Sequence, residues 1–224
     1  APGSEGRVQF SFRVRDASAL AREALKNLTI DIRALLRPGA AVAALPGIDI
    51  SGRAEAQAKI ETALTLAARG TYYAGTLVGS GPLPPKVGAE TIYTIVWSFS
   101  NAVNDVVNAE VRAGVPPYVR FTLVKSPPGE DILYDSARSE IVWRVPRIRA
   151  GAGTREAVKE VQFQIGLTPS AAQIGNAPSL LFGISASGQD EFTGNTIRVS
   201  ANDITTDLTQ SDPLVKSNQT RVVQ

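Results

Sequence analysis

Apolar and polar residues alternate in short segments along much of the chain, a period of two that is typical of half-buried β-strands. The clearest segment is residues 91–100, where Tyr93, Ile95, Trp97 and Phe99 are separated by smaller or polar residues. Further alternating segments lie within residues 105–113, 118–125, 140–146, 159–168, 179–187 and 197–201, with a short edge strand at 132–134. The pattern therefore predicts seven or eight strands between residues 91 and 201.

Turn-forming residues separate these segments. Clusters of Gly, Pro, Asn and Asp lie at the breaks, for example at residues 101–104, 116–117, 127–129 and 151–153. Short strands with turns at regular spacing predict an immunoglobulin-like β-sandwich. We therefore expect an all-β protein with one complete sandwich at residues 88–212.

A proline-rich stretch at residues 79–87 marks the clearest boundary in the chain. Pro82, Pro84 and Pro85 fix their own φ angles and lack a backbone N–H, so the stretch is expected to be a semi-rigid linker. It divides the chain into an upstream domain at 1–78, the linker, the sandwich, and a C-terminal tail at 213–224.

The upstream domain is similar in sequence to the second half of the sandwich. Val8-Gln9-Phe10 recurs as Val161-Gln162-Phe163, and the alternation at residues 28–34 matches that at 180–186. We interpret residues 8–66 as a repeat of residues 161–208.

Two upstream stretches, residues 18–26 and 53–68, have a composition that favours helices. For residues 53–68 the repeat favours strands instead. We predict strands there, with a helix as the alternative.

The repeat lacks the strands that would complete a sandwich. Three strands with one apolar face cannot bury that face alone, and their open edges invite pairing with another chain. Either a longer parent protein or another molecule supplies the missing strands. The start has neither Met nor a signal pattern, so we expect a processed product or a piece of a longer protein.

The residues expected to take part in assembly alternate on the predicted upstream strands or lie in the tail. They are Val8, Phe10, Phe12, Val14, Leu28, Ile30, Ile32, Val222 and Val223. The tail has two interpretations: a frayed terminus or the start of a further repeat, and a donor strand that adds to the open edge of another molecule.

The composition excludes several kinds of active site. The 224 residues include no His, no Cys and no Met. The chain therefore has no Ser-His-Asp triad, no thiolate nucleophile and none of the common zinc sites. Its carboxylates form no recognisable acid–base pair. We expect neither an enzyme nor a cofactor.

The charge and hydropathy patterns exclude two kinds of partner. The 23 basic and 21 acidic residues interleave and give a net charge of +2, so we predict no nucleic-acid partner. No apolar run approaches the roughly 20 residues that a membrane-spanning helix needs.

Oxygen-bearing side chains cluster near one predicted loop pair: Asp190, Glu191, Asn195 and Asp203. Oxygen ligands of this kind bind Ca²⁺, but their spacing matches no EF-hand, and Asp and Asn are also ordinary turn residues. We expect turn residues here and no metal site, with calcium binding as the alternative.

Several motifs resemble the conserved-repeat immunoglobulin-like modules of large bacterial cell-surface proteins. The motifs are the linker, Tyr93-Thr94-Ile95-Val96-Trp97, Val115-Pro116-Pro117-Tyr118, Glu140-Ile141-Val142-Trp143 and Phe163-Gln164-Ile165-Gly166-Leu167. The resemblance covers residues 79–212, and residues 7–66 more loosely. The first copy departs from the pattern because it lacks its front half.

This resemblance implies a structural module of an extracellular stalk, fibre or adhesin, without catalysis. The expected partners are other copies of the chain or neighbouring repeats, which would meet the open edge of the upstream domain. The alternative is an adhesin-type module that recognises surface glycan or protein through loops at one end of the sandwich.

Overall fold

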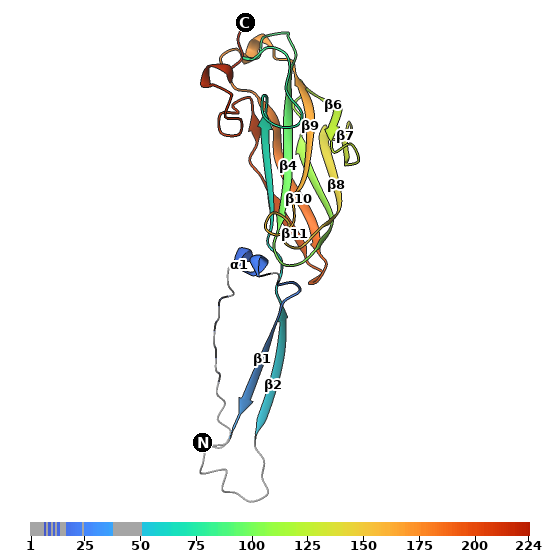
Figure 1. Cartoon of the computed structure of the whole chain (residues 1–224), viewed down its shortest axis with the longest axis vertical. Helices are drawn as coiled ribbons and strands as arrows, with labels where there is room; N and C mark the ends of the chain where they lie inside the picture. The colour runs from blue at the N-terminus through green and yellow to red at the C-terminus, as the bar shows by residue number, and fades with distance from the viewer. Residues whose placement is uncertain are drawn as a thin grey trace, which may run out of the picture.

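A computed structural model describes residues 17–23, 25–37 and 51–224, together with residues 7, 9, 11 and 13. These residues form two stacked β-sheets and a separate two-stranded ribbon that extends from one end of them (Figure 1). The elements are α1 (Ala17–Arg22), β1 (Thr29–Leu36), β2 (Gly52–Lys59), β3 (Leu64–Thr71), β4 (Thr91–Asn101), β5 (Val106–Gly114), β6 (Val119–Ser126), β7 (Asp131–Asp135), β8 (Glu140–Ile148), β9 (Lys159–Leu167), the 3₁₀ helix η1 (Ala171–Gln173), β10 (Ser179–Asp190), β11 (Thr196–Ser200), β12 (Ile204–Thr205) and the 3₁₀ helix η2 (Ser217–Gln219).

The two large sheets form an antiparallel β-sandwich. One sheet has the strand order β3-β4-β9-β6, and the other has the order β11-β10-β5-β8-β7, with β12 also paired to β10. In chain order these neighbours reproduce the A-B-E-D and G-F-C sheets of immunoglobulin-like domains. The predicted fold class, an all-β immunoglobulin-like sandwich, is confirmed.

The core lies between the sheets and is built from the alternate positions that the sequence pattern marks. Trp97 on β4 and Trp143 on β8 are both fully buried. The Phe99 and Trp143 rings stack across the two layers with centroids 5.5 Å apart, and Trp97 meets Phe163 edge-on at 4.8 Å. Both pairs add to the free energy gained by burial; Phe99 and Trp143 join the two sheets, whereas Trp97 and Phe163 pack within one sheet.

The upstream boundary differs from the expected one. Strand β3 pairs with β4 from Leu64↔Asn101 to Thr71↔Thr94, so it belongs to the sandwich although it precedes residue 78. Residues 79–87 do not connect two domains: Gly79 N–H donates to Tyr72 O (2.6 Å) and Ser80 bridges to Ile92. This stretch is part of the connection from β3 to β4. Strand β3 joins the sandwich because its Leu64 and Leu66 are buried in the core.

Upstream of β3, the structure combines a helix with strands. The helix-favouring residues 18–26 overlap α1, and the strand prediction for residues 53–68 is confirmed because β2 and β3 occupy most of that range. Strands β1 and β2 form the ribbon, which we call the arm. Among the described residues the arm is a single sheet, with no second layer stacked on it.

Candidate functional site

The arm extends from the sandwich at the end where α1 lies (Figure 1). Its two strands pair antiparallel in one uninterrupted register, from Thr29↔Lys59 to Leu36↔Gly52. Residues directly opposite each other in such a pair point to the same side, and successive residues point to opposite sides. The register therefore shows which side chains share each face.

One face of the arm is entirely apolar. We call this the apolar face; its members are Ile30, Ile32, Ala34 and Leu36 on β1 and Gly52, Ala54, Ala56 and Ala58 on β2. Leu36 is 69% exposed, and none of the eight residues belongs to a hydrophobic cluster formed by the described residues. Ile30, Ile32 and Gly52 are half-buried and the other five residues are exposed. A continuous, largely exposed apolar surface of this kind is typical of contacts with other molecules.

The opposite face is polar, with charges that are paired across the strands. Arg33 Nε lies 3.2 Å from Glu55 Oε1, and Arg53 also contacts that carboxylate. Gln57 Nε2 donates to Asp31 Oδ1 at 2.8 Å. This face is therefore stable in water, and the apolar face is the one that requires a cover.

A small hydrophobic cluster fixes the base of the arm to the sandwich. Leu20 of α1 is 8% exposed and packs with Ala102 and Val103, which follow β4. Leu25 and Leu28, in the segment that leads into β1, cover this cluster. The predicted assembly residue Leu28 thus lies in the base of the arm, whereas Ile30 and Ile32 lie on the apolar face.

A buried polar group fixes both strands of the arm at the same point. The fully buried Asn104 donates from Nδ2 to Ile60 O, just after β2, and to Asp190 Oδ2, both at 2.8 Å. Its Oδ1 accepts from Asn27 N–H, just before β1, at 3.1 Å. One side chain therefore holds the entry and the exit of the arm.

Three further residues complete this group: Asp190, Thr62 and Asn101. We call these three residues and Asn104 the anchor. Thr62 N–H donates to Asp190 Oδ2, and Thr62 Oγ1 donates to Asn101 Oδ1, both at 2.8 Å. Burial by itself would raise the pKa of the Asp190 carboxyl, but hydrogen bonds from Asn104 and from backbone N–H groups outweigh it and hold this pKa below its usual value. Satisfied networks of this kind stiffen the structure around them.

Ion pairs surround the anchor on the solvent side. Asp105 accepts from Lys26 Nζ and Arg147 Nη1, each at 2.8 Å, and Arg147 also makes two contacts of 2.6 Å with Glu191. Burial opposes the ionisation of Asp105, but these two cations and the Ala150 N–H lower the pKa of Asp105 overall. Lys26 thereby ties the segment before β1 to the sandwich.

The four calcium candidates contact other parts of the protein. Asp190 is buried in the anchor, Glu191 pairs with Arg147, and Asp203 accepts from Gly183 N–H at 2.8 Å. The backbone C=O of Asn195 accepts from Asp190 N–H at 2.9 Å. Within the part of the chain that the structure describes, no group of three or more acidic residues is placed to hold a metal ion.

Of the two interpretations of the tail, the structure does not match the donor strand. Val222 is 1% exposed and bridges to Ile174, while Val223 bridges to Lys86. The backbone N–H groups of Val222 and Val223 donate to Asn176 O and Pro85 O within the same chain. The hydrogen-bonding groups of the tail are therefore used at the far end of the sandwich and are not free for another molecule.

Asp212 fixes the start of this tail. Its buried Oδ2 accepts from three consecutive backbone N–H groups, Tyr72 at 2.8 Å, Tyr73 at 2.7 Å and Ala74 at 3.1 Å, and Oδ1 accepts from Leu214 N–H at 3.1 Å. Burial raises the pKa of this carboxyl, but the four N–H donors more than offset it, so its pKa is lowered.

The remaining assembly candidates Val8, Phe10, Phe12 and Val14 lie outside the described residues. Sequence reasoning missed the alanine side of the apolar face, although Ala54, Ala56 and Ala58 alternate with polar residues and carry a strand signal of their own. It also missed the anchor. Its members are far apart in the sequence, and only the fold brings them together.

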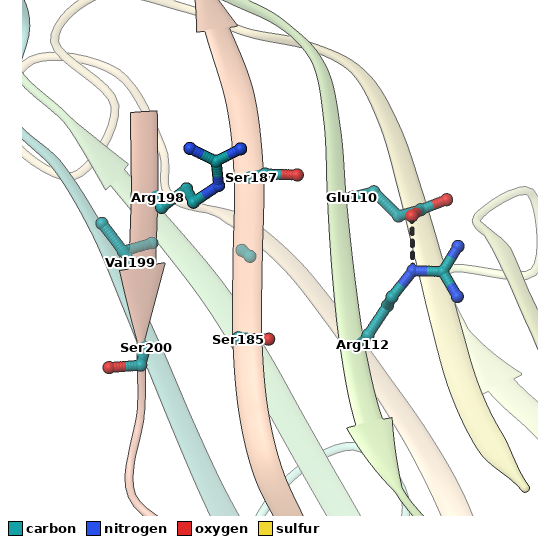
Figure 2. Close-up of a pocket in the computed structure, with 8 residues that line it drawn as sticks. Glu110, Arg112, Ser185, Ser187, Arg198, Val199 and Ser200 are labelled. Atoms are coloured by element: carbon teal, nitrogen blue, oxygen red, sulfur yellow. Dashed lines mark hydrogen bonds and ion pairs between the residues drawn. The ribbon is translucent and has the colours of Figure 1, made fainter. Parts of the chain in front are cut away.

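A second candidate surface lies on the outer side of the sandwich. It is an open hollow of about 400 Å³ lined by residues of β5, β10 and β11. Figure 2 shows the side chains that line it. Arg112 and Glu110 pair with each other there at 2.7 Å. Arg198 has no ion-pair partner among the described residues, and Ser185, Ser187 and Ser200 also line the hollow.

No helix in the described part of the chain is long and apolar enough to cross a membrane. No protein-family model matches the sequence, and no curated protein is significantly similar to it.

Solved structures with a distant similarity to the chain include two bacterial pilins and one enzyme. The chain is similar to a variant of BcpA, the major pilin subunit of Bacillus cereus, with 8% identity and a TM-score of 0.37 over 67% of this chain and 44% of that one. It is similar to the major pilin SpaD from Corynebacterium diphtheriae, with 10% identity and a TM-score of 0.34 over 62% and 34% of the two chains.

The enzyme is an inactive mutant of an exo-β-N-acetylglucosaminidase from Vibrio harveyi, with 8% identity and a TM-score of 0.33 over 65% of this chain and 18% of that one. The matched region spans less than half the length of each of these three proteins. All three likenesses are distant and assign no function to the chain.

Proposed function

We propose that the chain is a structural module of an extracellular stalk or fibre and that it associates with other copies through the arm. The observation that carries this proposal is the apolar face, which is exposed among the described residues although the ribbon is fixed to the sandwich by a buried anchor. The extracellular location rests on the resemblance of residues 79–212 to bacterial surface modules.

The low stability expected of the arm on its own supports the presence of a partner. An isolated two-stranded ribbon is only marginally stable in water and needs a further layer to be stable on its own. The anchor and the ion pair between Lys26 and Asp105 hold the arm at its base only, and the polar face gains little from exposed ion pairs. Burial of the apolar face against another molecule would supply the missing stabilisation.

Two charged residues on the apolar face are expected to abolish self-association. The wild-type chain should show a weight-average mass that rises with concentration in sedimentation equilibrium. The double variant Ile30→Asp and Ile32→Asp should remain monomeric, because two carboxylates would have to be desolvated in the contact. Its dissociation constant for self-association should be at least about 100-fold higher than that of the wild type.

The matched control places the same two charges on the other face of the same strand. Thr29 and Leu35 both lie on the polar face, so the variant Thr29→Asp and Leu35→Asp should associate like the wild type. A wild-type chain that stays monomeric at all concentrations would contradict the proposal. So would an equal loss of association in both double variants.

A second candidate function, an adhesin-type module that binds glycan, is favoured by one observation, the hollow shown in Figure 2. Arg198, which has no ion-pair partner among the described residues, and the serine residues beside it are of the kind that hydrogen-bond acidic sugars. A glycan array with the wild-type chain should then give hits among sialylated or uronic-acid glycans that Arg198→Ala reduces at least tenfold. An array without hits, or hits that Arg198→Ala leaves unchanged, would refute this candidate.

A further inference from the structure

We infer that the partner of the arm is the arm of a second copy, and that two arms pair apolar face to apolar face in a closed, two-fold dimer. This inference rests on the proposed function and specifies it: the partner is identified, and assembly through this surface ends at two copies. It is argued from the shape of the apolar face, from the placement of charge on the arm, and from the size of the contact.

The apolar face has a ridge and a groove. The β1 side carries the large side chains Ile30, Ile32 and Leu36. The β2 side, directly opposite in the register, carries only the small residues Gly52, Ala54, Ala56 and Ala58. A row of three large side chains, interrupted by Ala34, therefore runs beside a row of small ones.

This shape is complementary to itself. A two-fold axis parallel to the strands, lying between two facing ribbons, places β1 of each copy over β2 of the other. Each ridge then lies over the groove of the partner, with Ala34 of one copy facing Ala54 of the other. Facing sheets pack about 10 Å apart with interdigitated side chains, which a large row over a small row allows and two large rows would hinder.

Charge placement supports the same arrangement. The apolar face contains no titratable residue, and Asp31, Arg33, Arg53, Glu55 and Lys59 all lie on the polar face. Face-to-face pairing therefore leaves every charged group of both arms in water, with its ion pairs intact. Desolvation of a charge, the term that most often makes buried contacts unfavourable, does not arise.

The size of the contact sets its strength. Eight paired positions correspond to a face about 27 Å long and about 10 Å wide, so two faces bury on the order of 500 Å² in total. This is below the roughly 1,200 Å² of a stable specific interface, so the pair is expected to be weak in isolation. In a fibre that holds many arms close together, weak pairs of this kind add up through effective concentration.

The absence of cysteine from the sequence allows a direct test. In Ala34→Cys the new thiol lies on the apolar face, and in Arg33→Cys it lies one residue away on the polar face. A short bismaleimide should cross-link Ala34→Cys into dimers at least tenfold more efficiently than Arg33→Cys at the same protein concentration. Sedimentation velocity of the wild-type chain should show a monomer–dimer equilibrium with no larger species.

The outcomes separate this inference from the proposed function. Equal cross-linking of the two variants, or species that grow beyond the dimer, would overturn face-to-face pairing and leave association through the arm standing if the variant Ile30→Asp and Ile32→Asp still abolishes it. A chain that is monomeric at every concentration and forms no cross-link would overturn both.

Discussion

Replacing Asp190 by alanine is expected to lower the free energy of unfolding by about 3 kcal/mol. The Asp190 carboxylate is fully buried and accepts from Thr62 N–H, Asn104 Nδ2, Phe192 N–H and Thr193 N–H. Removing it leaves these donors without an acceptor, and each buried unsatisfied donor costs about 1–3 kcal/mol. Some of them recover hydration in the 191–194 loop, so the sum of the four costs is an upper limit.

The expected readouts are a lower melting temperature and a looser arm. For a chain of this length, 3 kcal/mol corresponds to a fall of about 6–12 °C. Amide exchange at Thr62 should become faster, because its N–H loses Asp190 as its acceptor. Asp203→Ala is the matched control: this exposed carboxylate accepts one hydrogen bond, from Gly183 N–H, and its loss should cost less than about 1 kcal/mol. Equal effects of the two variants would contradict the assigned role of the anchor.

Asp212→Asn is expected to destabilise the chain by about 2 kcal/mol at neutral pH and to flatten its acid unfolding. The Asp212 carboxylate accepts four backbone N–H groups through its two oxygens, whereas an amide offers only one oxygen. The hydrogen bonds that this charged group accepts are also stronger than those of a neutral amide. The loss should loosen the tail against residues 72–74.

The sign of the pH dependence follows from the lowered pKa of Asp212 in the folded chain. A carboxyl whose pKa is depressed by folding contributes stability that is complete above its unfolded pKa, about 3.9, and is lost as the pH falls through the folded value. Wild-type stability should therefore decrease below about pH 5, and the variant should decrease less steeply.

Urea unfolding monitored by tryptophan fluorescence at several pH values measures both quantities. Asp105 and Asp190 also have lowered pKa values, so Asp212→Asn removes only part of the acid dependence. Asp207→Asn serves as the control, since the Asp207 carboxylate is exposed and its partner among the described residues is Thr209. An acid limb as steep in Asp212→Asn as in the wild type would refute the assignment.

Most of the sandwich could be predicted from the sequence because each of its strands buries one face. That condition produces a period of two, and residues 91–101 show it most clearly, with Tyr93, Ile95, Trp97 and Phe99 fully buried. The turns were predictable for a related reason: Gly, Pro, Asn and Asp favour the backbone angles that turns require.

The pattern fails where a strand is irregular. Within residues 105–113 the alternation groups Val107 with Ala109 and Val111 on the inward face, but Asn108 has a φ of 52° and Val106 is the residue that is fully buried. Within residues 118–125 it groups Leu123 with Val119 and Phe121, but Leu123 is 75% exposed, with a φ of 70°. In both places the pairing with the neighbouring strand shifts register, between Ser187 and Gln189 and between Phe121 and Lys125. A strand's own sequence does not contain the register of its partner.

Local alternation also does not determine which sheet a strand joins. Strand β3 lies within residues 1–78, which the sequence assigns to a separate upstream domain. It nevertheless pairs with β4, because Leu64 and Leu66 are buried in the sandwich core. The tail was open to two interpretations in sequence and is paired to residues 85–87 and 174–176 of the same chain. Both outcomes depend on contacts between residues distant in the chain.

By itself the sequence determined an all-β sandwich, a chain without the residues of common active sites, and an upstream segment whose alternating apolar residues lack a complete core. These properties follow from local periodicity and composition, which each segment carries alone. Only the tertiary structure decided that β1 and β2 form an arm with one wholly apolar face, and that Thr62, Asn101, Asn104 and Asp190 hold it in place. The physical reason is that strand register and a buried hydrogen-bond network are properties of pairs of distant residues, and these pairs exist only once the chain has folded.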